Sequence, residues 1–166
     1  MALVIGEYII PDGPPSGGIQ FMKSASKVVY VADRTGQANQ SILSSVRTRC
    51  EFNVETIDQG GFYDPVLFEW TPSPGTYIMK AQVGIILLDS NNELDVRILK
   101  NGVEIYFGSS FSTTNNQSPV AAANGITIAN GTDIYTIEIE HDQGSALDMT
   151  SDPVISYVYG IKILEA

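Results

Sequence analysis

Three acidic residues in one short stretch are the first candidates for chemistry in this chain. Glu138, Glu140 and Asp142 alternate along "TIEIEHD", and on a β-strand residues two apart lie about 6.5–7 Å from one another on one face. That spacing is close to the separation of the carboxylate pair in a glycosidase. Such pairs normally come from different elements that face a cleft, so the preferred interpretation is a solvated acidic face, with a cation site as the second alternative.

The histidine and the cysteine add no support for an enzyme. His141 is the only histidine, and a Ser-His-Asp triad would have to run through "EHDQGS". The chain has no Gly-x-Ser-x-Gly motif and no glycine-rich phosphate loop. We therefore expect a structural histidine and no enzymatic activity. Cys50 is the only cysteine, which excludes an internal disulfide and a multi-cysteine zinc site, and it is expected to fill the core.

A second acidic stretch offers the ligands that calcium prefers. "DSNNELD" contains four residues with oxygen ligands, namely Asp89, Asn91, Glu93 and Asp95. It lacks the spacing and the glycine of an EF-hand loop, so a plain polar hairpin is the alternative. No other cofactor is expected.

Composition excludes two classes of partner. The chain of 166 residues carries 9 basic and 19 acidic residues, with a net charge of -10. A protein that binds nucleic acid needs a basic face, and the sequence shows none. No apolar run approaches the roughly 20 residues of a membrane span, and the N-terminus lacks the layout of a secretory signal. We therefore expect synthesis in the cytoplasm, with no nucleic-acid or membrane partner.

Strand patterns dominate the sequence, and only residues 37–46 could form a turn or two of helix. Apolar residues alternate with other residues in five stretches, which is typical of strands with one face buried. The expected rows on one face are Tyr77, Met79, Ala81, Val83, Ile85 and Leu87; Leu94, Val96 and Ile98; Val103, Ile105 and Phe107; Tyr135, Ile137 and Ile139; and Ile155, Tyr157, Tyr159, Ile161 and Ile163. Asn101-Gly102 predicts a hairpin turn, and residues 109–125 are expected to form a long polar loop. Many short strands joined by such turns indicate a β-sandwich.

The first 26 residues differ from the rest. A short apolar strand is followed by "PDGPPSGG", which can continue neither a helix nor a central strand. We interpret residues 1–26 as an arm or anchor and residues 27–166 as one domain. The alternative is a first strand with an irregular loop. The candidate anchor residues are Val4, Ile5, Tyr8, Ile9 and Ile10.

Four stretches in a fixed order carry a family resemblance. "GGFYDPVLFEWTPSPGTYIMKAQV" joins a Gly-aromatic segment to a proline corner and then to a long strand that starts at Tyr77. Around it lie "VVYVADRTGQANQSI", "LDVRILKNG" and "ISYVYGIKIL". Together they resemble the globular head domain of the complement first-component q protein and its tumour-necrosis-factor-like relatives. The resemblance implies an all-β, antiparallel jelly-roll sandwich of about ten strands that assembles as a tight homotrimer.

Apolar residues on the faces expected to point outward support assembly. Such rows usually mark an interface between subunits. The candidate interface residues are Ile78, Ile86, Leu88, Tyr106, Val154, Val158 and Leu164. The alternative is that these residues pack into the core after a shift of register.

The resemblance also suggests a setting. Similar heads occur on bacteriophage particles as fibre tips and capsid decorations, and they are anchored by a short N-terminal segment. We therefore expect a non-enzymatic structural protein of the virion surface, a trimeric head whose arm docks on the major capsid protein or another virion protein. The alternative is a receptor-binding fibre tip that recognises a host-surface glycan or protein. Its candidate contacts lie in the long loop: Phe111, Asn115, Asn116 and Gln117.

Overall fold

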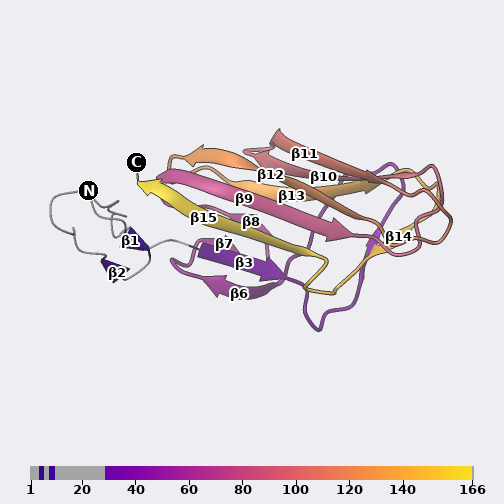
Figure 1. Ribbon diagram of the computed structural model, residues 1–166, viewed down its shortest axis with the longest axis horizontal. Helices are drawn as coiled ribbons and strands as arrows, with labels where there is room; N and C mark the ends of the chain where they lie inside the picture. The colour runs from indigo at the N-terminus through magenta and orange to yellow at the C-terminus, as the bar shows by residue number, and fades with distance from the viewer. Residues whose placement is uncertain (1–3, 6–7, 10–28, 166) are drawn as a thin grey trace.

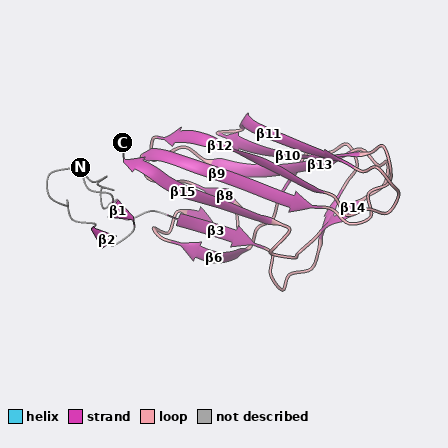
Figure 2. Ribbon diagram, in the orientation of Figure 1, coloured by secondary structure: helices cyan, strands magenta, loops and turns pink. Residues whose placement is uncertain are grey.

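The computed structural model describes residues 4–5, 8–9 and 29–165, and within them every regular element is a strand (Figures 1 and 2). One 5-stranded sheet has the order β12-β9-β15-β3-β6. Its strands are β12 (Val120–Ala129), β9 (Gly75–Gly84), β15 (Tyr157–Glu165), β3 (Val29–Asp33) and β6 (Val54–Asp58). We call it the front sheet, because it faces the viewer in Figure 1.

The second sheet, which we call the back sheet, has 6 strands in the order β11-β10-β13-β8-β7, with β5 also paired to β13. Its strands are β11 (Val103–Phe111), β10 (Glu93–Lys100), β13 (Tyr135–His141), β8 (Glu69–Trp70), β7 (Tyr63–Asp64) and β5 (Thr48–Arg49). Two further antiparallel pairs are β1 (Val4–Ile5) with β2 (Tyr8–Ile9), and β4 (Gln40–Ile42) with β14 (Leu147–Met149). All pairings are antiparallel, so the predicted all-β sandwich is confirmed. The possible helix at residues 37–46 is wrong, because β4 lies there and pairs with β14.

The strands give the sandwich two distinct ends. β3 begins and β15 finishes at the same end, which we call the base. The opposite end, which we call the distal end, carries the loops 85–92, 112–119, 142–146 and 150–156 together with β14 (Figure 1). Most of the arm expected at residues 1–26, including Ile10, lies outside the described residues. Val4 and Ile5 pair with Ile9 and Tyr8 in the β1–β2 hairpin.

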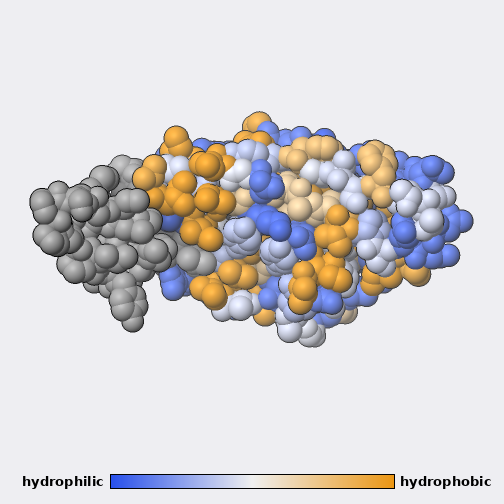
Figure 3. All heavy atoms as spheres, viewed as in Figure 1, coloured by the Kyte–Doolittle hydropathy of each residue, from blue (hydrophilic) through white to orange (hydrophobic). Residues whose placement is uncertain are grey.

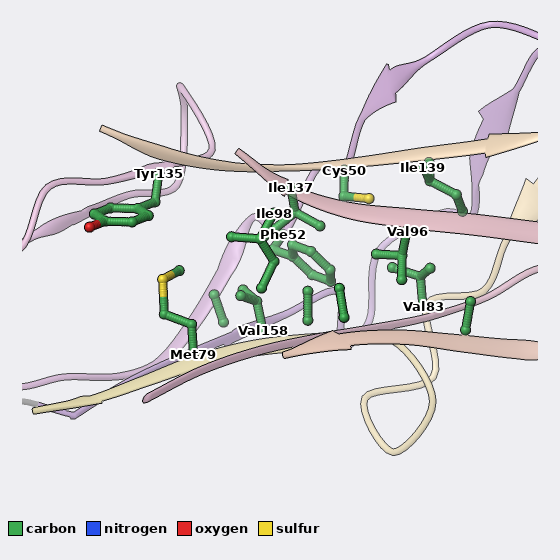
Figure 4. Packing of buried hydrophobic residues seen from close by; sticks show 14 of the residues in the cluster. Cys50, Phe52, Met79, Val83, Val96, Ile98, Tyr135, Ile137, Ile139 and Val158 are labelled. Atoms are coloured by element: carbon green, nitrogen blue, oxygen red, sulfur yellow. The ribbon is translucent and has the colours of Figure 1, made fainter. Parts of the chain in front are cut away.

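The core lies between the two sheets and follows the predicted alternation in three strands. Tyr77, Met79, Ala81 and Val83 of β9 are buried. They face the buried rows of β10 and β13, and Figure 4 shows Met79, Val83 and Val158 opposite Val96, Ile98 and Ile139. Burial of such side chains contributes about 1.5–3 kcal/mol each. The inward rows predicted for these three strands are therefore confirmed.

An aromatic cluster fixes the proline corner before β9. Trp70 stacks on Tyr30 at a ring-centroid distance of 4.3 Å and meets Tyr77 edge-on at 4.9 Å. The Tyr77 hydroxyl donates a hydrogen bond to the Ser73 carbonyl oxygen at 3.0 Å. Gly75 has φ +154°, and a Cβ there would lie 2.7 Å from the Leu164 carbonyl oxygen. The corner therefore has a folding role, since it brings the chain into β9 against the aromatic core.

The register of β15 is the opposite of the one predicted. Its buried positions are Val158, Gly160 and Lys162, in line with Ser156 just before the strand, so the row expected inside, at Tyr157, Tyr159 and Ile161, lies on the outer face. The cause is the aromatic cluster. A Cβ at Gly160 would lie 2.5 Å from Tyr30 Cε1 and 2.7 Å from Trp70 Cη2, so only a residue without a side chain fits opposite these rings.

A second register change follows β9. Leu87 has φ +66° and is exposed, while Leu88 is fully buried. The predicted inward position of Leu87 is therefore wrong, and so is the outward position of Leu88. The left-handed backbone at Leu87 breaks the strand alternation, so that Leu87 points outward and Leu88 inward. The pattern of apolar residues in the sequence does not reveal such a change of backbone conformation.

The two sheets meet closely along one side, where β11 lies against β12. A Cβ at Gly108 would lie 2.0 Å from the Ala122 carbonyl oxygen. The Tyr106 hydroxyl donates a hydrogen bond to the Ile126 carbonyl oxygen, and the Tyr106 ring fills the space beside Gly125. The predicted long loop at residues 109–125 is therefore wrong. Residues 109–111 belong to β11 and residues 120–125 to β12, so the loop between them spans only residues 112–119.

Candidate functional site

The outer face of the front sheet carries an apolar row that crosses three strands. Ile126 of β12 pairs with Ile78 of β9, which pairs with Ile161 of β15. Ile126 is 60% exposed, and Ile128, two residues further along β12, is 68% exposed. Leu164 at the end of β15 is also exposed. Figure 3 shows apolar residues gathered on this face toward the base, and we call this group of five residues the front patch.

A polar row lies next to the front patch, toward the distal end. Lys80 of β9 pairs with Asn124 of β12 and Tyr159 of β15. The Lys80 ammonium donates hydrogen bonds to Gln82 Oε1 at 3.0 Å and to the Tyr157 hydroxyl at 2.8 Å. The rings of Tyr157 and Tyr159 are stacked with centroids 6.3 Å apart. These contacts fix the orientation of the side chains on this part of the face without any contact from a second subunit.

The structure corrects two of the seven interface candidates. Leu88 and Val158 are buried in the core, so they cannot form a surface between subunits. Ile78, Val154 and Leu164 are exposed, and Ile86 and Tyr106 are half-buried; whether they contact a partner stays a prediction. Sequence reasoning missed Ile126 and Ile128, although "NGITIAN" has the alternation of a strand, because Gly125 was read as part of a turn.

The edge strand β11 of the back sheet exposes three further apolar side chains. The expectation of Val103, Ile105 and Phe107 on one face is wrong, because a bulge opposite Ile98 and Leu99 leaves Phe107 paired with Arg97 and Val103 paired with Lys100, on opposite sides of the strand. Val103, Phe107 and Phe111 are exposed, at 66%, 51% and 61%. The Phe107 ring covers Arg97 of β10, with the guanidinium carbon 5.3 Å from the ring centroid. We call Val103 and Phe107, toward the base, the edge patch.

Arg97 and the acidic residues around it form a charge network on the outer face of the back sheet. Its guanidinium lies 2.7 Å from Asp95 Oδ2, 3.2 Å from Glu104 Oε2 and 3.1 Å from Glu140 Oε2. Arg47 also lies 3.7 Å from Glu140. Burial raises the pKa of Asp95, although the neighbouring Arg97 acts in the opposite direction. Glu140 therefore sits in ion pairs on a sheet face, and not opposite a second carboxylate in a cleft as glycoside hydrolysis requires.

The residues of the proposed calcium stretch do not come together around one point. Asp95 pairs with Arg97, while Asp89 Oδ1 accepts a hydrogen bond from the Asn116 backbone N–H at 3.1 Å. Asn91 sits in a turn with φ +66°. In the part of the chain that the structure describes, no group of three or more His, Cys, Asp or Glu side chains could hold a metal ion. The geometry therefore gives the calcium alternative at Asp89, Asn91, Glu93 and Asp95 no support.

His141 and Cys50 have structural surroundings. His141 is buried, its Nε2 lies 3.0 Å from the Ile42 carbonyl oxygen, and its Nδ1 accepts a hydrogen bond from the Gln143 N–H at 3.4 Å. These bonds tie the end of β13 to β4. Cys50 is 1% exposed, and burial raises the pKa of its thiol far above the ordinary value. Neither group is available to a substrate.

The four candidate ligand residues are at the distal end, but they are held to different degrees. Phe111 is the exposed last residue of β11. Asn115 Oδ1 accepts hydrogen bonds from both the backbone N–H and the hydroxyl of Ser90, and Gln117 pairs through its backbone with Leu88. Asn116 has φ +58°. The loop is therefore braced against the 85–92 loop, and its ligand role stays a prediction.

Comparisons with known proteins find a likeness in structure alone. No protein-family model matches the sequence, and no curated protein is significantly similar to it. Among the described residues no helix is long and apolar enough to cross a membrane. The globular domain of zebrafish complement 1qA protein matches with a TM-score of 0.61 at 15% identity, over 84% of this chain and 100% of that one.

Two further solved structures belong to the tumour-necrosis-factor ligands. Eiger TNF from S. frugiperda matches with a TM-score of 0.64 at 8% identity, over 84% of this chain and 94% of that one. Murine APRIL at pH 5.0 matches with a TM-score of 0.62 at 13% identity, over 83% of this chain and 100% of that one. Likeness at such low identity shows the fold, which confirms the sequence-based expectation. The chain therefore has the jelly-roll fold shared by complement first-component q head domains and tumour-necrosis-factor ligands.

Proposed function

We propose that the chain is a non-enzymatic structural protein of a virus particle, a homotrimeric head that projects from the bacteriophage surface. The observation that carries the proposal is the front patch. Ile78, Ile126 and Ile128 expose apolar surface on the face of a well-packed sheet, and contiguous surface of this kind marks a contact with another protein.

The two apolar patches favour a ring rather than a twofold dimer. The front patch lies on the outer face of the front sheet, whereas Val103 and Phe107 of the edge patch lie on β11, the edge strand of the back sheet. A twofold contact needs one self-complementary surface, whereas two different surfaces that bind each other build a ring when the rotation between subunits closes. A trimer is the ring that the family resemblance implies.

The proposed attachment to a particle is argued from the base, where the chain enters the sandwich. The chain enters the sandwich there through β3, after the β1–β2 hairpin of Val4, Ile5, Tyr8 and Ile9. A two-stranded hairpin is only marginally stable alone in water, so this apolar hairpin needs a partner. We infer that residues 1–26 dock on the major capsid protein or another virion protein, which leaves the distal end facing outward.

Light scattering of the full chain tests the trimer. We expect a mass three times the 18.0 kDa of one chain. Ile126→Asp should give the mass of one chain while the protein stays folded, and Val66→Asp, at an exposed loop position outside both patches, should stay trimeric. A full chain that scatters as a monomer would refute the assembly.

Purified particles test the anchor separately. The trimer should co-purify with capsids, and deletion of residues 1–26 should abolish co-purification without changing the trimer mass. Co-purification that survives the deletion would refute the role of the arm but not the trimer.

A receptor-binding fibre tip is the second candidate, and one observation favours it. The distal end exposes Leu87 and Phe111, at 51% and 61%. Large apolar side chains at this end are not needed for solubility, and they suit contact with a partner. A glycan array probed with the trimer tests the glycan form of this candidate. Specific binding that is lost on substitution of Asn115 or Gln117 would favour it over a purely structural role.

A further inference from the structure

We propose that a shallow hollow at the distal end receives a lysine or arginine side chain of a protein partner. The hollow has a volume of about 230 Å³ and is lined by Ile86, Leu87, Ala146, Leu147 and Asp148. It belongs to a single subunit, so the proposal is independent of the trimer and goes beyond the structural role of the head.

Leu87 forms one wall of the hollow in a strained and well-braced conformation. Its φ of +66° is rarely adopted by a bulky residue. The residues on both sides are held, since the Ile86 N–H donates to the Asp148 carbonyl oxygen at 2.9 Å and the Leu88 N–H donates to the Gln117 carbonyl oxygen at 2.6 Å. Strain of this kind persists only when the surroundings enforce it, and it clusters at functional sites. Here it keeps a leucine side chain 51% exposed.

Asp148 supplies the charge of the hollow. It is exposed, and within the described residues its carboxylate has no hydrogen bond or ion pair with another side chain. The stretch from Asn101 to Gly160 contains no lysine or arginine. The loops 85–92, 142–146 and 150–156 add Asp89, Asp142 and Asp152, whereas Arg34 and Arg47, in the neighbouring loops of the same end, are already paired with Glu51 and with Glu104 and Glu140. The distal end therefore carries an excess of negative charge.

The chemistry of the hollow matches one kind of occupant. A lysine or arginine side chain has an apolar stem and a cationic head. The stem can pack against Leu87 and Leu147 while the head pairs with Asp148, and the surrounding acidic residues steer a basic partner toward the end. A polyanionic glycan would be repelled by the same field, so the partner is a protein with a basic residue on an accessible loop.

Methyl NMR of the full chain, with Ile, Leu and Val methyl groups labelled, tests the proposal. The probe is the peptide acetyl-Gly-Arg-Gly-amide, compared with acetyl-Gly-Glu-Gly-amide and with glucosamine. We expect saturable shifts at Ile86, Leu87 and Leu147 with the arginine peptide, which weaken as salt is raised, and no such shifts with the other two probes.

Two substitutions locate the contact. Asp148→Asn should weaken binding roughly two- to fivefold, as for an exposed ion pair. The matched control Asp142→Asn removes one charge from the same end outside the hollow, and it should leave the affinity nearly unchanged. Leu87→Gly should weaken binding with little change in the melting temperature.

Three results would overturn the proposal. Equal weakening by Asp142→Asn and Asp148→Asn would show attraction by the general field only. Shifts scattered over the surface, or no saturable shift at all, would show that the hollow has no occupant of this class. Binding of glucosamine in place of the peptide would make the partner a cationic glycan.

Discussion

Gly160→Ala is the substitution whose cost follows most directly from the structure. The new methyl group would lie 2.5 Å from Tyr30 Cε1 and 2.7 Å from Trp70 Cη2, whereas ordinary contact begins at 3.4 Å. The two rings would have to retreat by about 1 Å. Neither can move into solvent, because both are at most 2% exposed and they stack on each other at 4.3 Å.

Overpacking of this kind costs about 1–3 kcal/mol. For a protein of this size, each kcal/mol lowers the melting temperature by about 2–4 °C. Trp70 is the only tryptophan, so its fluorescence reports the unfolding of the cluster itself. Urea and thermal unfolding of the wild type and of Gly160→Ala, followed by fluorescence and by circular dichroism, give the difference in free energy.

A double-mutant cycle supplies the control. Trp70→Phe removes part of the ring that the methyl group would meet, so Gly160→Ala should cost less in the Trp70→Phe background than in the wild type. If Gly160→Ala changed stability by less than about 0.5 kcal/mol, the size of an ordinary surface substitution, the steric account of the β15 register would be refuted.

Three more predictions concern other parts of the chain. Leu87→Gly should leave the free energy of unfolding in urea within about 0.5 kcal/mol of the wild type, because relief of the left-handed strain offsets both the entropy cost of glycine and the lost burial of half the side chain; a loss of more than about 1 kcal/mol would contradict the strain. Burial raises the pKa of the Asp33 and Asp133 carboxyls, but hydrogen bonds to the carboxylates, including one from Lys100 to Asp133, outweigh it and lower both pKa values. The stability they contribute should be present above the ordinary carboxyl pKa of about 4 and be lost as the pH falls through the lowered pKa values, and Asp133→Asn should reduce that loss in urea titrations at successive pH values. The Cys50 thiol, whose pKa burial raises, should resist iodoacetamide in the native protein and react in urea, as mass spectrometry would show; rapid native labelling would contradict its place in the core.

The fold was predictable wherever the apolar pattern is local. The alternation in β9, β10 and β13 identified three core strands, and Asn101-Gly102 marked the turn between β10 and β11, where both residues have positive φ. In each case residues close in the sequence carry the information.

The errors arise where a distant residue decides the local structure. The register of β15 depends on the room that Tyr30 and Trp70 leave for Gly160, and these rings come from β3 and β8. Gly125 lies inside β12 because the Tyr106 ring occupies its side-chain position. A single sequence does not reveal such contacts, so β12 and its exposed Ile126, which the trimer proposal needs, were missed.

The start of β3 and the end of β15 lie together at the base, and this has a mechanical consequence. β3 and β15 lie side by side and antiparallel, and β15 also pairs with β9. A force between the start of β3 and the end of β15 would peel the two strands apart one hydrogen bond after another. A force between the arm and the distal end would load the same ladders along the strands, so that their hydrogen bonds resist together. A head anchored at its base and bound by a partner at its distal end would therefore be loaded along its strands, the direction in which their hydrogen bonds resist force most strongly.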